Sequence, residues 1–177
     1  MKKYIKPITV MLAIILLCGG LLAILSDLLF VPNEERIQRA IDKIYSNGNV
    51  QLEQTIDVNS VDMTEFSDVG VIKACYKLDN GDYLVLSTGK KGYSNGTVTT
   101  YVAIDNTVTV KSVVEDSYTG QTLMAKLSSL YSKFIDKTAA NSKEQVFEPV
   151  TGATYSANAA ANSVYLALQF VSKVIGG

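Results

Sequence analysis

The chain has 177 residues, with 16 Lys and Arg against 17 Asp and Glu, a formal net charge of −1, and neither His nor Trp. The balanced charge argues against a nucleic-acid-binding protein, because binding to phosphate backbones needs a clustered basic surface and none stands out. The absence of His removes the usual general base at neutral pH and the commonest zinc ligand. We therefore expect neither a catalytic acid–base site nor a metal site.

The amino terminus is typical of a membrane anchor. Residues Ile8–Val31 form an almost unbroken apolar run that follows three lysines, and at about 1.5 Å per residue the run is long enough to cross a bilayer. Because positive residues stay on the cytoplasmic side, residues 1–31 are predicted to be a cytoplasmic amino terminus and a single transmembrane helix in the cell membrane. The rest of the chain would then be extracytoplasmic. A cleaved signal peptide is the alternative, although its apolar core is usually only about 7–15 residues long.

Residues 32–68 are predicted to be a short amphipathic helix and a connecting segment. Ile37, Ile41 and Ile44 recur at helical spacing among charged side chains. Residues Asn47–Asp68 are polar with scattered apolar positions, and their pattern assigns no element.

Residues 69–177 are predicted to form one domain that begins with strands. Val71–Leu78 and Tyr83–Ser87 flank the turn sequence Asp79-Asn80-Gly81, which favours a hairpin. Apolar side chains then alternate from Val98 to Ile104, and Thr107–Val114 resumes as another strand. The pattern predicts an antiparallel meander.

Two helices are predicted to flank this sheet. The first includes Leu123, Leu127, Leu130, Tyr131 and Phe134. The second spans Ser156–Ile175 and presents an apolar face made of Ala160, Val164, Ala167, Leu168, Val171 and Ile175. The expected fold class is α+β, an antiparallel sheet with flanking helices behind one amino-terminal transmembrane helix.

The segment Thr151-Gly152-Ala153-Thr154-Tyr155-Ser156 precedes the second helix and favours a bound phosphate. Gly152 and Ala153 leave the backbone open to a bulky group, and the first helical N–H groups and the helix macrodipole favour an anion. Thr154 offers a hydroxyl at the same place, so a phosphate there could be bonded covalently. The alternative is an ordinary loop with Ser156 as the N-cap of the helix.

This segment resembles the [Ser/Thr]-Gly-Ala-Thr flavinylation motif of the FMN-binding domain family, which includes the flavin-carrying subunits of Rnf-type ion-translocating electron transport complexes and of sodium-pumping NADH:quinone oxidoreductases. The resemblance implies that Thr154 carries FMN through its phosphate, within a cofactor site that includes Thr151, Gly152, Ala153, Tyr155 and Ser156. It also implies maturation by a flavin transferase that uses FAD as donor. In the family an Asp stands three residues before the motif, and here that residue is Glu148.

Two further segments resemble the family in the same order. Lys91–Gly96 is similar to a Gly-Tyr-Gly-like turn that leads into strands, and Glu115–Gly120 is similar to an acidic Glu-Thr-Pro-Gly segment before a helix. The resemblance thereby adds Glu115, Tyr118, Thr119 and Gly120 to the expected flavin site. Tyr118 stands where the family has Glu, and the Pro before Gly120 is missing. Tyr93, Tyr118 and Tyr155 are candidates to flank the flavin ring.

The implied function is that of an electron-carrier subunit in an Rnf-like complex, which is not a catalyst by itself because the flavin performs the redox chemistry. Its partners would be membrane lipid, the other membrane subunits and the flavin transferase. Two alternatives are a stand-alone surface flavoprotein for extracellular electron transfer and a cofactor-free membrane-anchored binding module.

Overall fold

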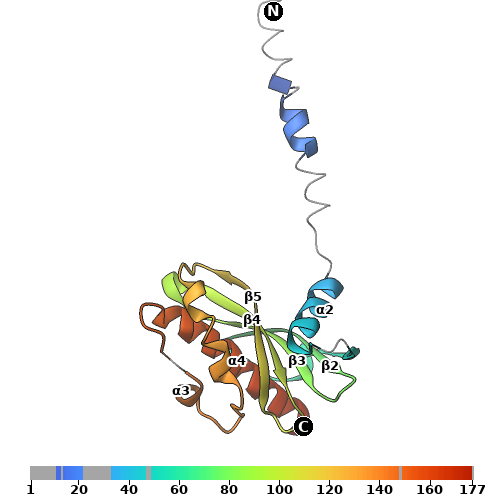
Figure 1. Cartoon of the computed structure of the whole chain (residues 1–177), viewed down its shortest axis with the longest axis vertical. Coiled ribbons are helices and arrows are strands. Elements are labelled where there is room, and N and C mark those ends of the chain that lie inside the picture. The colour runs from blue at the N-terminus through green and yellow to red at the C-terminus, as the bar shows by residue number, and fades with distance from the viewer. Residues whose placement is uncertain (1–10, 13, 22–32, 47–48, 148, 177) are drawn as a thin grey trace, which may run out of the picture. The chain divides into compact units, whose positions relative to one another are not determined.

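The computed structural model describes residues 11–12, 14–21, 33–46, 49–147 and 149–176 (Figure 1). The chain divides into two units, residues 1–37 and residues 38–177. In the first unit, residues 14–21 are helical and their large apolar side chains are exposed. Within the described residues, no helix has both the length and the apolar character that crossing a membrane requires. Most of the predicted span Ile8–Val31 lies outside the described residues.

Helix α2 (Asn33–Ile44) confirms the predicted amphipathic helix. Glu34 and Glu35 lie in its first turn and Lys43 in its last, which complements the helix macrodipole. Directly after the helix, the hydroxyl of Tyr45 donates a hydrogen bond of 2.6 Å to Asp82.

The sheet has five antiparallel strands in the order in which they occur along the chain, which confirms the predicted meander. They are β1 (Leu52–Ile56), β2 (Gly70–Leu78), β3 (Tyr83–Gly89), β4 (Thr97–Ile104) and β5 (Val110–Thr119). Strand β1 lies in the segment that the sequence left unassigned. Strand β5 begins later than predicted because the carboxylate of Asp105 accepts hydrogen bonds from the N–H groups of Thr107 and Thr109 and holds these residues in a turn.

The turn between β2 and β3 has the geometry that its sequence predicts. The N–H of Gly81 donates to the carbonyl of Leu78 at 3.0 Å, and the N–H of Leu78 donates to the carbonyl of Asp82 at 2.8 Å. Gly81 has a φ of +86°, in the left-handed region that favours glycine. The result is a hairpin with a three-residue loop.

The predicted α-helix over residues 123–134 is wrong. The structure has two 3-10 helices instead, η4 (Met124–Leu127) and η5 (Tyr131–Phe134). Met124, Leu127 and Leu130 are buried and recur every three residues, which is the period of a 3-10 helix. Three shorter segments of the same kind are η1 (Val58–Ser60), η2 (Thr64–Phe66) and η3 (Tyr93–Asn95).

Helix α4 (Thr154–Gly176) lies across one face of the sheet, against β3 and β4, and the short helix α3 (Lys143–Val146) precedes it (Figure 1). Of the predicted apolar face, Ala160, Val164, Ala167, Leu168 and Val171 are fully buried, whereas Ile175 is exposed. A buried hydrogen bond of 2.8 Å between Thr100 and Ser163 also joins the helix to the sheet. The long helix therefore has a fixed start relative to the strands.

Candidate functional site

The start of α4 leaves backbone donors open at the predicted motif. The first hydrogen bond of the helix runs from the N–H of Ala157 to the carbonyl of Ala153 at 2.9 Å, which makes Ala153 the N-cap residue. Its methyl side chain cannot accept a hydrogen bond, and Ala is a poor N-cap residue. The N–H groups of Thr154, Tyr155 and Ser156 therefore point out of the helix toward whatever lies before it.

Helix α4 begins two residues earlier than predicted, and the alternative of Ser156 as N-cap is wrong. Ser156 is the third residue of the helix and is buried. Its hydroxyl donates a 2.6 Å hydrogen bond to the side chain of Gln121 instead of accepting one from the helix.

The loop before α4 exposes the hydroxyl of Thr154. Thr151, Gly152 and Thr154 are exposed, and the Thr154 hydroxyl donates to the carbonyl of Val150 at 3.3 Å. Gly152 has a φ of +76°, and a Cβ atom added there would lie 3.0 Å from the Nζ atom of Lys126. The motif therefore combines an accessible hydroxyl, open N–H donors and a nearby ammonium group. Glu148, the expected recognition residue of the transferase, lies outside the described residues.

A cavity of about 380 Å³ lies in front of this helix start. Its lining combines the motif with two other chain segments and consists of Tyr93, Thr122, Leu123, Gly152, Ala153, Thr154, Tyr155 and Ser156. The residues Tyr93 and Tyr155 are 54% and 66% exposed, which leaves their rings available to a flat ligand. Ligand cavities usually measure about 300–1,000 Å³, so this one is of suitable size.

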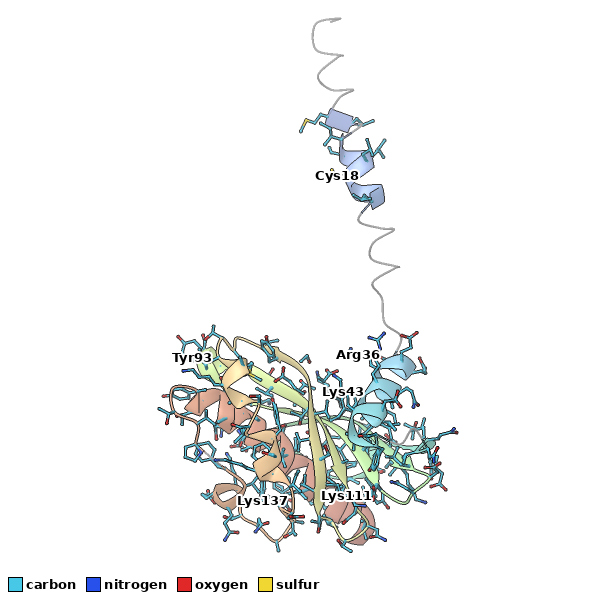
Figure 2. The ribbon with its side chains drawn as sticks, in the orientation of Figure 1. Cys18, Arg36, Lys43, Tyr93, Lys111 and Lys137 are labelled. Carbon is cyan, nitrogen blue, oxygen red and sulfur yellow. The ribbon has the colours of Figure 1, made fainter. Side chains whose placement is uncertain are left out.

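The loop that carries Tyr93 is anchored on α4 (Figure 2). Asn158 and Asn162, one helical turn apart, donate hydrogen bonds of 3.1 and 2.7 Å to the carbonyls of Lys91 and Lys90. Lys91, Ser94 and Asn95 all have positive φ angles. Residues other than glycine rarely adopt this conformation, and where they do so together they are often at a functional site. The predicted Gly-Tyr turn thus leads from α4 to the cavity wall.

The acidic segment that the resemblance added lies apart from the cavity lining. Glu115 lies within β5 and accepts a 2.8 Å hydrogen bond from the hydroxyl of Tyr131. Burial, together with the hydrogen bond and the charge of Glu115, raises the pKa of Tyr131. Tyr118 and Thr119 pair with β4, and Gly120 packs against Gly96. A direct contact between these residues and a flavin remains a prediction.

Three residues near the cavity carry no sequence signal of their own. Thr122 and Leu123 line the cavity, and Lys126 reaches the motif from η4. Only their place on or next to the 3-10 helix beside the Thr151–Ser156 loop brings them there, and such proximity cannot be read from spacing.

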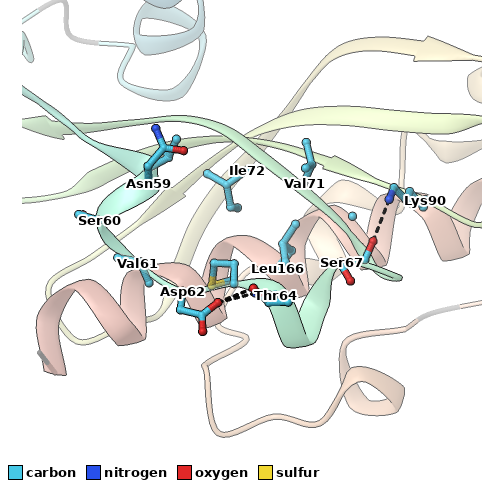
Figure 3. A pocket seen from close by; sticks show the side chains of 13 residues that line it. Asn59, Ser60, Val61, Asp62, Thr64, Ser67, Val71, Ile72, Lys90 and Leu166 are labelled. Carbon is cyan, nitrogen blue, oxygen red and sulfur yellow. Dashed lines mark hydrogen bonds between the residues drawn. The ribbon is translucent and has the colours of Figure 1, made fainter.

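A larger cavity of about 610 Å³ lies elsewhere in the same unit, between the segment 58–67 and strand β2 (Figure 3). Its charged groups already have partners. Lys90 donates to the carbonyl of Ser67 at 2.8 Å, and Asp62 accepts from the hydroxyl and the N–H of Thr64. Size alone therefore does not make this cavity the better candidate. Among the described residues, no cluster of acidic side chains and cysteines could hold a metal ion.

Comparison with protein families places a known domain over the site. Residues 92–169 match the family model of the FMN-binding domain. The match includes every residue that lines the smaller cavity and all of the motif. No match was found among curated proteins or among solved structures. The chain therefore contains a domain like those that bind FMN, and its residues fit that group through their phosphate donors, exposed aromatic rings and cavity size.

Proposed function

We propose that this protein is an electron-transfer flavoprotein that holds FMN through a phosphoester bond to Thr154. The observation that carries the proposal is the exposed Thr154 hydroxyl in the first turn of α4, beside open N–H groups and at the wall of the cavity. The FMN-binding domain match over the same residues supports the identity of the cofactor. Covalent attachment is the finer part of the proposal.

The attachment is a phosphoryl transfer from FAD, in the manner of the family that the motif resembles. The Thr154 oxygen forms a bond to the phosphorus of the FMN half, the pyrophosphate bond breaks, AMP leaves, and the hydroxyl proton is released. No electrons are exchanged, so the flavin keeps its redox state. An exposed Thr154 leaves room for a transferase to reach the hydroxyl.

The phosphate group is held by donors that are otherwise open. The N–H groups of Tyr155 and Ser156 can donate to phosphate oxygens, and the ammonium group of Lys126 adds a positive charge. A cation next to a helix amino terminus is unfavourable because both are positive. An anion between them would remove this repulsion, which supports a phosphate at this position.

The flavin ring occupies the cavity beside the exposed rings of Tyr93 and Tyr155. These residues position and shield the cofactor, and FMN supplies the electron-transfer chemistry. Thr154 acts as a tether and performs no acid–base step.

We further propose that the protein is anchored in the cell membrane with its FMN domain outside the cytoplasm, as a subunit of an Rnf-like ion-translocating complex. The exposed apolar side chains of the helical residues 14–21 and the preceding lysines support an anchor. A tether is useful outside the cytoplasm, since a cofactor lost there would not be recaptured. The other membrane subunits would supply the ion path, because one span cannot form a channel.

The test uses the full chain co-expressed with a flavin transferase. Denatured protein is separated on a gel and flavin fluorescence is recorded under ultraviolet light for wild type, Thr154→Val and Thr151→Val. Thr151→Val makes the same chemical change at an exposed position three residues away. Fluorescence in the wild type and in Thr151→Val, but not in Thr154→Val, is the expected result. A dark wild type would support a cofactor-free binding module, and a fluorescent Thr154→Val would refute the attachment site.

Co-purification separates the complex from a stand-alone surface carrier. Recovery of multi-span membrane subunits with the mildly solubilised protein is expected for an Rnf-like complex. Recovery of the flavinylated chain alone would favour a stand-alone carrier for extracellular electron transfer.

A further inference from the structure

Gln121 lies where three segments of the FMN-binding region meet, and its amide group bonds to all three. Its Oε1 atom accepts from the N–H of Tyr93 at 3.1 Å and from the hydroxyl of Ser156 at 2.6 Å. Its Nε2 atom donates to the carbonyl of Thr119 at 3.0 Å and to that of Tyr93 at 3.4 Å. The side chain thereby joins the loop before β4, the end of β5 and the first turn of α4.

The surroundings of Gln121 are shaped for an amide. The residue is only 7% exposed, and its two N–H donors and its carbonyl oxygen all have partners. A Cβ atom added at Gly92 or at Gly96 would lie 2.4 Å from the Nε2 atom. Any other residue at either glycine would therefore displace the amide.

Two of the residues that Gln121 joins lie on two walls of the cavity. Tyr93 comes from the loop between β3 and β4, and Ser156 comes from the helix start that carries Thr154. The two walls are connected here through one side chain, so a change in that side chain moves one wall relative to the other.

We infer that Gln121 is a positioning residue of the flavin site, which sets the Tyr93 wall against the first turn of α4. The inference rests on the proposed function, because it assigns Gln121 a role toward the bound flavin. Gln121 itself need not touch the cofactor. Its effect on flavin passes through Tyr93 and Ser156.

Three variants test this role in the full chain. Gln121→Glu keeps the size of the side chain but replaces the donating nitrogen with an oxygen that faces two carbonyls. Gln121→Leu removes all four hydrogen bonds. Ser156→Ala removes only the bond to α4 and serves if either Gln121 variant fails to fold. Thr100→Val is the matched control, because it removes another fully buried hydrogen bond, to Ser163, that lies outside the cavity lining.

The measurements are the rate of flavin attachment by the transferase, the visible circular dichroism of the bound flavin and its reduction potential. A misplacement of about 1 Å can slow a reaction by about a hundredfold. We expect attachment to slow by about tenfold or more in Gln121→Leu and Gln121→Glu, with altered dichroism and a shifted potential. Thr100→Val, although destabilised, should keep the wild-type spectrum and potential.

Acid should partly restore Gln121→Glu, because a protonated carboxyl group regains one donor toward the carbonyl of Thr119. Its dichroism should move toward that of the wild type as the pH falls, while the wild-type signal stays constant over the same range. Equal spectra and potentials in the Gln121 variants, Ser156→Ala, Thr100→Val and the wild type would overturn the inference alone. A wild type without covalent flavin would overturn the proposed function, and the inference with it.

Discussion

The Nζ atom of Lys126 lies 3.0 Å from the place that a Cβ atom would occupy at Gly152. The φ of Gly152 is +76°, a conformation that costs a residue with a side chain about 1–2 kcal/mol. Gly152→Ala should therefore lower the free energy of unfolding by about that amount and push the ammonium group away from the motif. Urea unfolding measures the first effect, and the yield of covalent flavin measures the second.

Gly81→Ala is the control for backbone strain. Gly81 has a similar φ of +86°, and nothing lies within 4 Å of its added Cβ atom. The two variants should lose similar stability, but only Gly152→Ala should lose flavin. Equal flavin yields in both would contradict a role for the Gly152 position in the site.

Lys126 should assist flavin attachment through its charge. Replacing it in Lys126→Gln removes an interaction between a cation and a phosphate worth about 0.3–1 kcal/mol at an exposed site. The FAD concentration for half-maximal attachment should then rise by about two- to fivefold, and the difference should shrink at high salt because exposed charges are screened. Lys133→Gln, an equal change on the neighbouring 3-10 helix η5, should leave this concentration unchanged. A matching rise in Lys133→Gln would mean that only net charge matters.

Asp82 should stabilise the junction after α2. Its carboxylate is almost fully buried, accepts hydrogen bonds from Tyr45 and Asn80, and forms an ion pair with Lys111 at 3.0 Å. Asp82→Asn should lower the free energy of unfolding by about 1–3 kcal/mol, because it leaves buried donors without a charged acceptor. Urea unfolding of Asp79→Asn, the same change at an exposed position of the same turn, provides the comparison. A similar small loss in both variants would show that the Asp82 network adds little.

Cys75 should make the wild type less stable in alkali. The thiol is fully buried, and burial raises its pKa to about 12, whereas an unfolded cysteine titrates near about 8.5. The folded state therefore binds the proton more tightly, so this stability is complete below about pH 8.5 and is lost progressively as the pH rises toward 12. At pH 10 the loss should be about 2 kcal/mol.

Urea unfolding at pH 8 and pH 10, with wild type and Cys75→Val, checks this loss. The variant should lose less stability over the interval. Tyr45 and Tyr131, whose pKa values are also raised by burial, remain in both proteins and cancel in the comparison. Parallel losses in the two proteins would show that the thiol does not ionise on unfolding.

The sequence predicted the strands that alternate strongly and the turns that need glycine. The alternation from Val98 to Ile104 corresponds to β4, and Asp79-Asn80-Gly81 corresponds to the β2–β3 turn. Strand β1 was missed because four of its five residues are exposed, so no buried face produces an alternating pattern. Its conformation comes from pairing with β2, which is a tertiary effect.

The site was predictable only where local sequence fixes local geometry. Gly152 and Thr154 lie in a short motif whose loop and helix start are determined by neighbours in the chain. Gln121 instead acts across 28 to 35 residues, as the separations of its hydrogen bonds to Tyr93 and Ser156 show. Lys126 likewise reaches Gly152 from a separate element. Their partners depend on how β5, η4 and α4 pack together, and a single sequence carries no signal for that packing.

Peptide mapping of the flavinylated protein tests the central claim most directly. Cleavage after lysine releases residues 144–173, a peptide that contains both Thr151 and Thr154. Fragmentation in a mass spectrometer should place the mass of one FMN, less one water, on Thr154. The adduct on Thr151, Tyr155 or Ser156, or a peptide of unmodified mass from protein co-expressed with an active transferase, would contradict the account.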